Sequence, residues 1–134
     1  MSGRAEERPQ SMDTRSKILT PAEAAALGKP VIMVTGYFDV LRGEHVRELD
    51  AVRQRNRGAR LLAVVLPSSE EILPQQARAE LVAALRVIDY VVIADTAAAG
   101  RLAASIEPVE TSHLETGDAR RARELKDHVH RRQT

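Results

Sequence analysis

The sequence predicts an α/β protein in which a parallel sheet of four to five strands lies between two layers of helices. Two continuous apolar runs, 31–35 and 60–66, are typical of central parallel strands that are buried on both faces. Amphipathic segments alternate with these runs, and short loops join them. Connections of this kind favour right-handed crossovers, so we predict a Rossmann-like, three-layer α/β/α architecture.

The order of the elements follows from their caps and apolar periods. Thr20, Pro21 and Glu23 predict a helix start, because Thr and Glu can form a capping box and Pro suits the first helical position. The expected elements after it are strand 31–35, helix 43–57, strand 60–66, helix 76–86, strand 90–94, helix 97–106, edge strand 109–114 and helix 118–131. The side chains expected to face the core from the helices at 43–57 and 76–86 are Val46, Leu49, Val52, Leu81, Val82 and Leu85.

The composition excludes several classes of function. Aromatic residues make up 2% of the 134 residues and the net charge is +1, so no stacking or basic surface for nucleic acid is expected. Cysteine is absent, which excludes disulfides and thiolate sites. Residues 1–17 are polar and lack an apolar period, so we expect a disordered leader before a single domain over 18–134. We also expect no membrane partner and a cytoplasmic location.

The most informative segment is 31–45, where an apolar run ends at Thr35-Gly36 and a helix is expected to begin at Gly43. A strand that breaks at glycine and leads into a helix start is where open α/β sheets bind phosphates. Backbone amides and the positive end of the helix dipole point toward the anion at such a place. The segment therefore predicts a phosphate-binding site at the carboxyl end of the first central strand.

Two segments of the chain resemble a known family. Residues 35–45, Thr-Gly-Tyr-Phe-Asp-Val-Leu-Arg-Gly-Glu-His, are similar to the (T/N)-G-x-F-D-x-x-H-x-G-H loop of cytidylyltransferase-like nucleotidyltransferases. Residues 78–92 are similar to the R-x-x-x-L-x-x-L-x-x-V-D-x-V segment of that family. The likeness extends over residues 17 to about 114, and the sequence looks most like heptose-phosphate adenylyltransferase domains and glycerol-3-phosphate cytidylyltransferases.

The resemblance implies nucleotidyl transfer. In that reaction a phosphate on a small sugar or alcohol attacks the α-phosphate of ATP or CTP, and pyrophosphate leaves; Mg²⁺ accompanies the triphosphate. His45 and Arg42 occupy the positions of the two motif histidines and are the expected catalytic residues. The expected nucleotide-binding residues are Thr35, Gly36, Tyr37, Phe38, Asp39, Gly43 and Arg78. The resemblance also implies a homodimer, and we expect no metal ligands from the protein.

The chain departs from the family pattern at three places. Arg42 replaces the first motif histidine, and arginine still brings positive charge to phosphate. Glu44 replaces the motif glycine, and its carboxylate at ~4 Å from a phosphate charge would cost several kcal/mol at an intermediate dielectric. The loop over 67–75 lacks a lysine and carries Glu70 and Glu71 instead. Because the three changes affect one site, we expect reduced or absent activity.

Each candidate residue also has a purely structural interpretation. His45 could be an ordinary residue of the first helical turn, and Arg42 and Glu44 could form a surface ion pair. Asp39 could only support its own loop, which we favour over metal binding. Arg78 could be a solvated helix residue.

Three functional hypotheses therefore remain at this point. The first is a small nucleotidyltransferase. The second is a non-catalytic relative, a pseudoenzyme that binds a nucleotide, a sugar phosphate or a protein. The third is a detached partner domain of a bifunctional sugar-kinase enzyme. His113, on the expected edge strand, is not expected to be a ligand.

Overall fold

A computed structural model describes residues 13–39, 43–68 and 73–116, and it contains a five-stranded, wholly parallel sheet. The strand order is β1-β4-β3-β2-β5. The two apolar runs form β2 and β3 at the middle of this sheet, as predicted. The strands are β1 (Ile18–Leu19), β2 (Val31–Gly36), β3 (Arg60–Val65), β4 (Tyr90–Ile93) and β5 (Glu110–His113).

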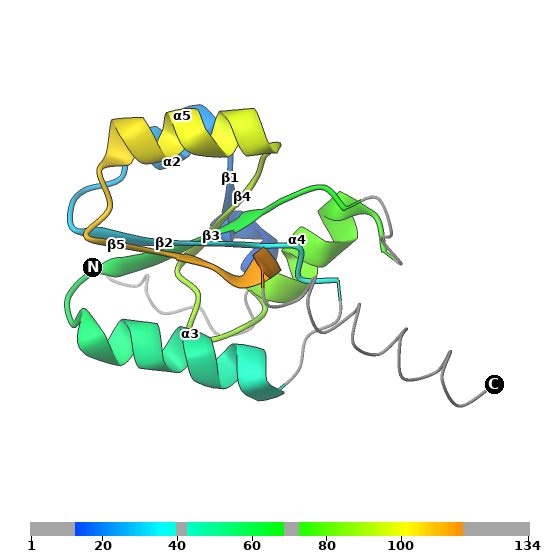
Figure 1. The fold of residues 1–134 in the computed structure, drawn as a ribbon. Coiled ribbons are helices and arrows are strands. Elements are labelled where there is room, and N and C mark those ends of the chain that lie inside the picture. Colours follow the sequence, from blue (N-terminus) through cyan, green and yellow to red (C-terminus); the bar gives the residue numbers. More distant parts are fainter. Residues whose placement is uncertain (1–12, 40–42, 69–72, 117–134) are drawn as a thin grey trace, which may run out of the picture.

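Helices cover both faces of the sheet, so the predicted three-layer α/β/α fold is confirmed (Figure 1). One face carries α2 (Pro21–Ala25) and α5 (Thr96–Ile106), and the other carries α3 (Gly43–Arg55) and α4 (Gln75–Ala83). Alternate residues of the strands feed two separate apolar cores, because successive side chains of a strand point to opposite faces. Among the described residues, no helix has the length and apolar character needed to cross a bilayer.

The helix start predicted at Thr20 forms, and an aspartate caps a second helix. Thr20 accepts a hydrogen bond from the Glu23 backbone N–H, and the Glu23 carboxylate accepts one from the Thr20 backbone N–H. This capping box satisfies two amides that lack partners within the helix. Asp95 caps α5 by accepting from the Ala98 N–H at 2.7 Å. The helix predicted over 118–131 lies outside the described residues.

The phase of two helices differs from the prediction. Val46 and Leu81 were expected in the core, but they are 40% and 47% exposed. In α3 the buried positions are His45, Leu49 and Val52, so the polar histidine takes the inward place that Val46 was expected to fill. In α4 the inward side includes Arg78. The apolar pattern failed at both places because a polar side chain occupies the buried face.

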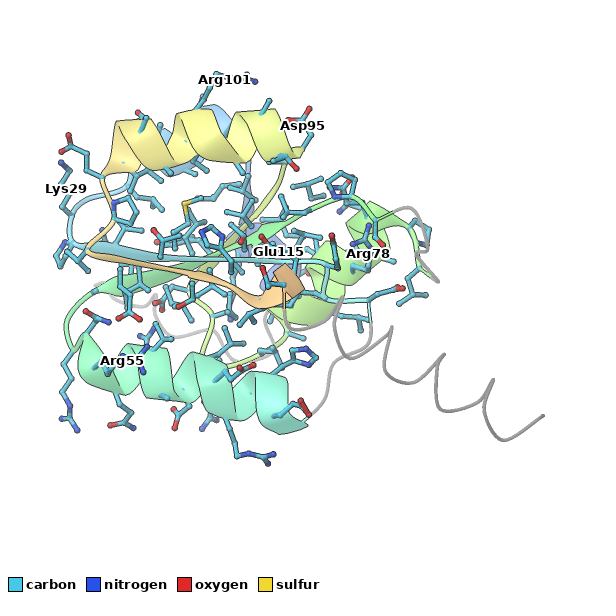
Figure 2. All side chains as sticks on the ribbon, viewed as in Figure 1. Lys29, Arg55, Arg78, Asp95, Arg101 and Glu115 are labelled. Carbon is cyan, nitrogen blue, oxygen red and sulfur yellow. The ribbon has the colours of Figure 1, made fainter. Side chains whose placement is uncertain are left out.

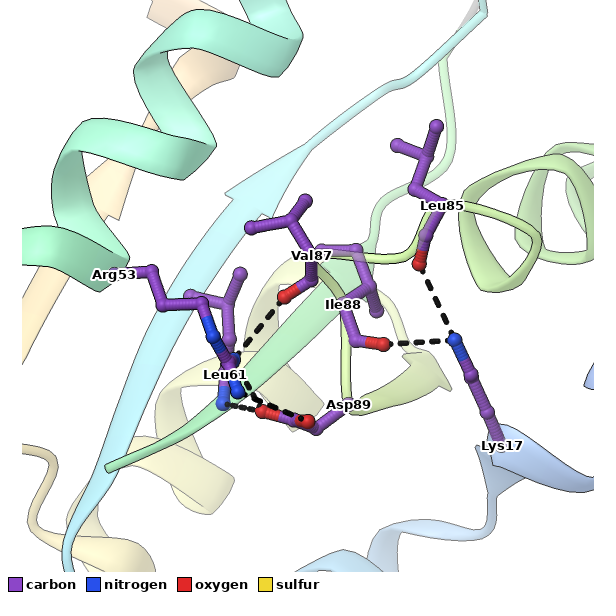
Figure 3. A network of polar contacts seen from close by, with 7 residues as sticks. All are labelled: Lys17, Arg53, Leu61, Leu85, Val87, Ile88 and Asp89. Atoms are coloured by element: carbon purple, nitrogen blue, oxygen red, sulfur yellow. Dashed lines mark hydrogen bonds and ion pairs between the residues drawn. The ribbon is translucent and has the colours of Figure 1, made fainter. Parts of the chain in front are cut away.

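The sheet also begins earlier than expected. Residues 14–17 form a short 3₁₀ helix, η1 (Thr14–Lys17), although 1–17 was expected to be a disordered leader. The Lys17 ammonium donates to the backbone carbonyls of Leu85 and Ile88 at 3.2 and 2.9 Å (Figure 3). Burial lowers the pKa of Lys17, and the charge of Asp89 opposes that shift. These contacts tie η1 to the turn that leads from α4 into β4.

The same turn is held from its other side by Asp89. Its Oδ2 accepts from the Leu61 backbone N–H at 2.8 Å and from Arg53 Nη1 (Figure 3). Arg53 also donates to the Val87 carbonyl at 3.1 Å. The aspartate of the second family-like segment thus joins β3, α3 and β4 at the amino edge of the sheet, at the opposite end of the strands from Gly36.

Strand β5 is attached to α3 by a charged cluster. The Glu110 carboxylate accepts from Arg55 Nη2 and from Asn56 Nδ2. The hydrogen bond from Arg55, followed by that from Asn56, lowers the pKa of Glu110 below its ordinary value. Because β5 begins at Glu110, this cluster fixes the amino end of the strand beside β2.

Candidate active site at the carboxyl edge of the sheet

The strand order places a topological switch point at β2. From β2 the chain proceeds through β3 to β4 on one side, whereas β5 joins β2 on the other side. In open α/β sheets, ligands bind outside the carboxyl ends of the strands at such a point. The crevice of this protein is therefore expected beyond Gly36 of β2 and His113 of β5. The first turn of α3 follows the same strand end (Figure 1).

The turn after β2 is shaped by the contact between Gly36 and Phe38. Phe38 has a φ of +54°, a left-handed conformation that a bulky residue rarely adopts, and its ring is buried. A Cβ on Gly36 would lie 3.0 Å from two atoms of that ring. The left-handed backbone at Phe38 brings its ring against the end of β2. Glycine is needed at position 36 because a larger side chain would collide with that ring.

Asp39 links this turn to the loop before α4. Its Oδ1 accepts from the Leu73 backbone N–H at 3.1 Å. The bond joins the segment after β2 to the segment after β3, whereas the structural interpretation expected Asp39 to support its own loop. The glycine at the start of α3 has a different status from Gly36. A Cβ on Gly43 would meet only the end of the flexible Arg47 side chain.

Arg78 is fully buried, and the structural interpretation that it could be a solvated helix residue is wrong. Its Nη1 donates to the backbone carbonyls of Tyr37 and Leu66 at 2.6 and 2.8 Å. Its Nε donates to the Leu73 carbonyl at 3.0 Å. The guanidinium therefore joins three loop segments that follow β2, follow β3 and precede α4 (Figure 2).

His45 lies in the first turn of α3 and is 2% exposed. Its neighbour Glu44 is half-buried in the same turn. The structure therefore brings the predicted residues Thr35 to Asp39, Gly43 and His45 to one end of the sheet, with Arg78 holding the surrounding loops. Arg42, the other expected catalytic residue, lies outside the described residues.

The sequence reading missed a polar cluster on β5. The Thr35 hydroxyl donates to Glu115 Oε1 at 2.7 Å and lies 2.8 Å from His113 Nδ1. His113 Nδ1 is 3.5 Å from Glu115 Oε2. Thr35 is buried, whereas the His113 side chain is 59% exposed and that of Glu115 is 22% exposed. The signal that could have found this cluster is the switch point, because β2 and its edge neighbour end side by side there.

Comparisons with known proteins find relatives of part of this chain. The chain is 33% identical over 90 residues to the bifunctional protein HldE of Coxiella burnetii strain Dugway 5J108-111, and to that of strain RSA 493 / Nine Mile phase I. The match covers 60% of this chain and 18% of the relative, so the chain spans less than a fifth of the length of these relatives. No protein-family model matches the chain.

A solved structure shares the fold. The lipopolysaccharide core biosynthesis protein from Thermoplasma volcanium GSS1 superposes with a TM-score of 0.55 at 22% identity, over 63% of this chain and 73% of that chain. The sequence match to HldE supports the resemblance to cytidylyltransferase-like nucleotidyltransferases, and the solved structure shows that the fold is shared. The two family-like segments have separate places in the fold. Residues 35–39 form the end of β2 and the turn after it, and Arg78 and Asp89 of the second segment hold neighbouring loops and turns.

Proposed function

We propose that the protein binds a nucleoside triphosphate, ATP or CTP, at the carboxyl edge of β2 and transfers its nucleotidyl group slowly to a phosphorylated sugar or alcohol. The observation that carries this proposal is the position of His45 in the first turn of α3, directly after the Gly36–Phe38 turn at the switch point. Helix N-termini with this geometry stabilise phosphate charge. A histidine there can add a donor to the α- or β-phosphate as negative charge develops.

The proposal includes a reduced rate because of Glu44. This carboxylate sits in the first turn of α3, where a polyanion would approach the backbone amides. Its charge opposes the binding that the helix end favours. The same residue favours a second candidate function, in which the chain binds a nucleotide or sugar phosphate without catalysing transfer.

Mg²⁺ belongs to the proposal as a companion of the triphosphate. The described residues contain no group of three His, Cys, Asp or Glu side chains that could hold a metal ion. Magnesium in nucleotide sites commonly keeps several waters and binds one or two carboxylates together with the substrate phosphates. When bound, the ion would supply charge neutralisation on the phosphates.

A homodimer and a cytoplasmic location complete the proposal. Both rest on the family likeness and on the use of nucleoside triphosphates, which are cytoplasmic metabolites. Sedimentation at several protein concentrations tests the first, and fractionation of cells that express the tagged chain tests the second.

Calorimetric titration with ATP and CTP in the presence of Mg²⁺ tests binding, and pyrophosphate release with a panel of sugar phosphates tests transfer. Binding at a concentration of 100 times Kd should stabilise the fold by about 2.7 kcal/mol. Absence of both binding and a thermal shift with every nucleotide would exclude the proposed function. Binding without pyrophosphate release would favour the second candidate.

A double variant tests the motif changes directly. Arg42→His with Glu44→Gly restores the family pattern, and we expect it to tighten nucleotide binding by about tenfold or more as a repulsive charge is removed. The matched control is Arg47→His with Glu48→Gly, which makes the same chemical changes at exposed positions of α3. Equal behaviour of the two double variants would show that the Arg42–Glu44 changes do not limit binding.

A further inference from the structure

We propose that the groove between α3 and the turn from α4 to β4 is a docking surface for an acidic amphipathic helix of a partner protein. The groove has a volume of about 540 Å³. Its apolar lining comes from Val46 of α3 and from Leu85 and Val87 of the turn. The proposed nucleotide site lies at the carboxyl edge of β2, so this inference goes beyond that function and does not rest on it.

Val46 gives the groove an apolar side chain that the fold itself does not bury. It is 40% exposed because His45 takes the inward position in the first turn of α3. On the opposite wall, Leu85 and Val87 pack against the core and are only partly buried. Aliphatic side chains from two elements therefore line one hollow, and a partner with an apolar face would remove them from water.

The walls of the groove are held in place by the fold. Arg53 reaches from α3 to the Val87 carbonyl at 3.1 Å and forms an ion pair with Asp89 (Figure 3). Lys17 holds the same turn from its other side, where it donates to the Leu85 carbonyl (Figure 3). Little conformational entropy is lost when a partner binds a surface that is already ordered.

The charges of the groove favour an acidic partner. Arg47 and Arg86 are exposed, and within residues 13–39, 43–68 and 73–116 neither of them forms an ion pair. The charge of Arg53 is balanced by Asp89, and the only carboxylate among the described lining residues is that of Asp50. Each wall thus carries an unpaired guanidinium beside its apolar side chains. Carboxylates that flank an apolar stripe complement this arrangement.

The backbone of the groove determines which form of partner it can take. A strand would need unpaired amides and carbonyls, but one wall is a helix whose backbone groups pair with each other. On the turn, Arg53 and Lys17 already occupy carbonyls. Recognition must therefore use side chains, as it does when an amphipathic helix lies in a groove.

Other occupants fit the charges less well. Two copies of the chain that met at this groove would bring together two sets of the same unpaired arginines, and like charges repel. Residues 1–12 have equal numbers of acidic and basic side chains, and residues 117–134 have more basic than acidic ones. Nucleic acid would contact the arginines through its phosphates and would leave the aliphatic side chains uncovered.

Fluorescence anisotropy with synthetic peptides of about 18 residues, long enough to form a helix, tests the proposal on the full chain. The probe peptide has leucines along one helical face and glutamates on both sides of that stripe. One control peptide has lysines in place of the glutamates, and the other has the same composition with the leucines spread around the helix. We expect the probe to bind at least tenfold more tightly than either control, and more weakly as salt is added.

Variants of exposed residues show whether the probe uses the groove. Val46→Asp should weaken probe binding by at least tenfold, whereas Val109→Asp, at a valine that is 58% exposed and outside the groove, should not. Arg47→Ala with Arg86→Ala should weaken it by about tenfold. The matched control is the double alanine variant of Arg60 and Arg101, which are exposed and lie outside the groove. Circular dichroism checks that every variant is folded.

The inference fails if no peptide binds, if the probe and its controls bind equally, or if groove and control variants lose affinity alike. It also fails if a DNA oligonucleotide binds more tightly than the probe, or if the chain forms a dimer that Val46→Asp dissociates, because the groove would then have another occupant. The nucleotide titrations report on a separate site, so none of these results decides the proposed function.

Discussion

Replacement of Arg78 by methionine should destabilise the protein strongly, because the guanidinium serves three backbone carbonyls in a fully buried position. Methionine matches much of the volume but donates no hydrogen bond. The carbonyls of Tyr37, Leu66 and Leu73 would then lose their donor. At about 1 kcal/mol for each unsatisfied buried group, the lower end of the usual range, the loss is about 3 kcal/mol.

Urea unfolding followed by circular dichroism measures this loss. With a slope of roughly 2 kcal/mol per molar urea, the midpoint should fall by about 1.5 M, and Tm should fall by roughly 10 °C. Arg101→Met on the exposed surface of α5 makes the same chemical change and should shift the midpoint little. Arg78→Lys should lie between the two, because one ammonium cannot reproduce the planar fork of donors.

The reasoning would be refuted if Arg78→Met lowered the free energy of unfolding by less than about 1 kcal/mol with an unchanged slope. Such a result would mean that water or a neighbouring donor replaces the guanidinium without cost. It would also remove the argument that Arg78 holds the loops around the crevice.

Three other changes should have measurable effects. Gly36→Ala forces a methyl group against the Phe38 ring and should cost about 1–3 kcal/mol in thermal or urea unfolding; an unaltered Tm would contradict the contact. Asp89→Ala removes an acceptor for one backbone amide and one guanidinium, and we expect a loss of about 2 kcal/mol by the same assay. Because the pKa of Glu110 is lowered in the fold, Arg55 and its neighbours stabilise the protein above the ordinary pKa of glutamate. That stability is lost as the pH falls through the pKa of Glu110 in the folded protein. Glu110→Gln should therefore have a lower free energy of unfolding at neutral pH, and this free energy should fall less steeply toward acid pH than in the wild type. If the two proteins lost stability in parallel as the pH fell, the linkage would be disproved.

The sequence predicted the layers and the end of the first central strand, because these depend on local signals. Buried strands show as apolar runs, and the break at Gly36 marks the strand end. The helix phases were harder to predict because His45 and Arg78 occupy inward positions where the pattern expected Val46 and Leu81. A buried polar residue is specified by partners that lie elsewhere in the chain, and its own neighbours in sequence do not reveal them.

The cluster of Thr35, His113 and Glu115 escaped prediction for a related reason. Thr35 belongs to the family-like loop, but His113 and Glu115 stand in no recognisable motif, and each is an ordinary residue when it is considered alone. Their relation depends on which strand lies beside β2, and local pattern does not determine strand order. Only the pairing of β2 with β5 shows that the three side chains meet.

The two outermost strands of the sheet also limit how copies of the protein can associate. β1 has only two residues, and β5 consists of Glu110, Thr111, Ser112 and His113. A very short edge strand and a polar edge strand are poor templates for pairing with the strands of another copy. The apolar central strands are therefore protected from aggregation. If the chain dimerises, we expect the contact to be made through helix surfaces or loops, with the two sheets remaining separate.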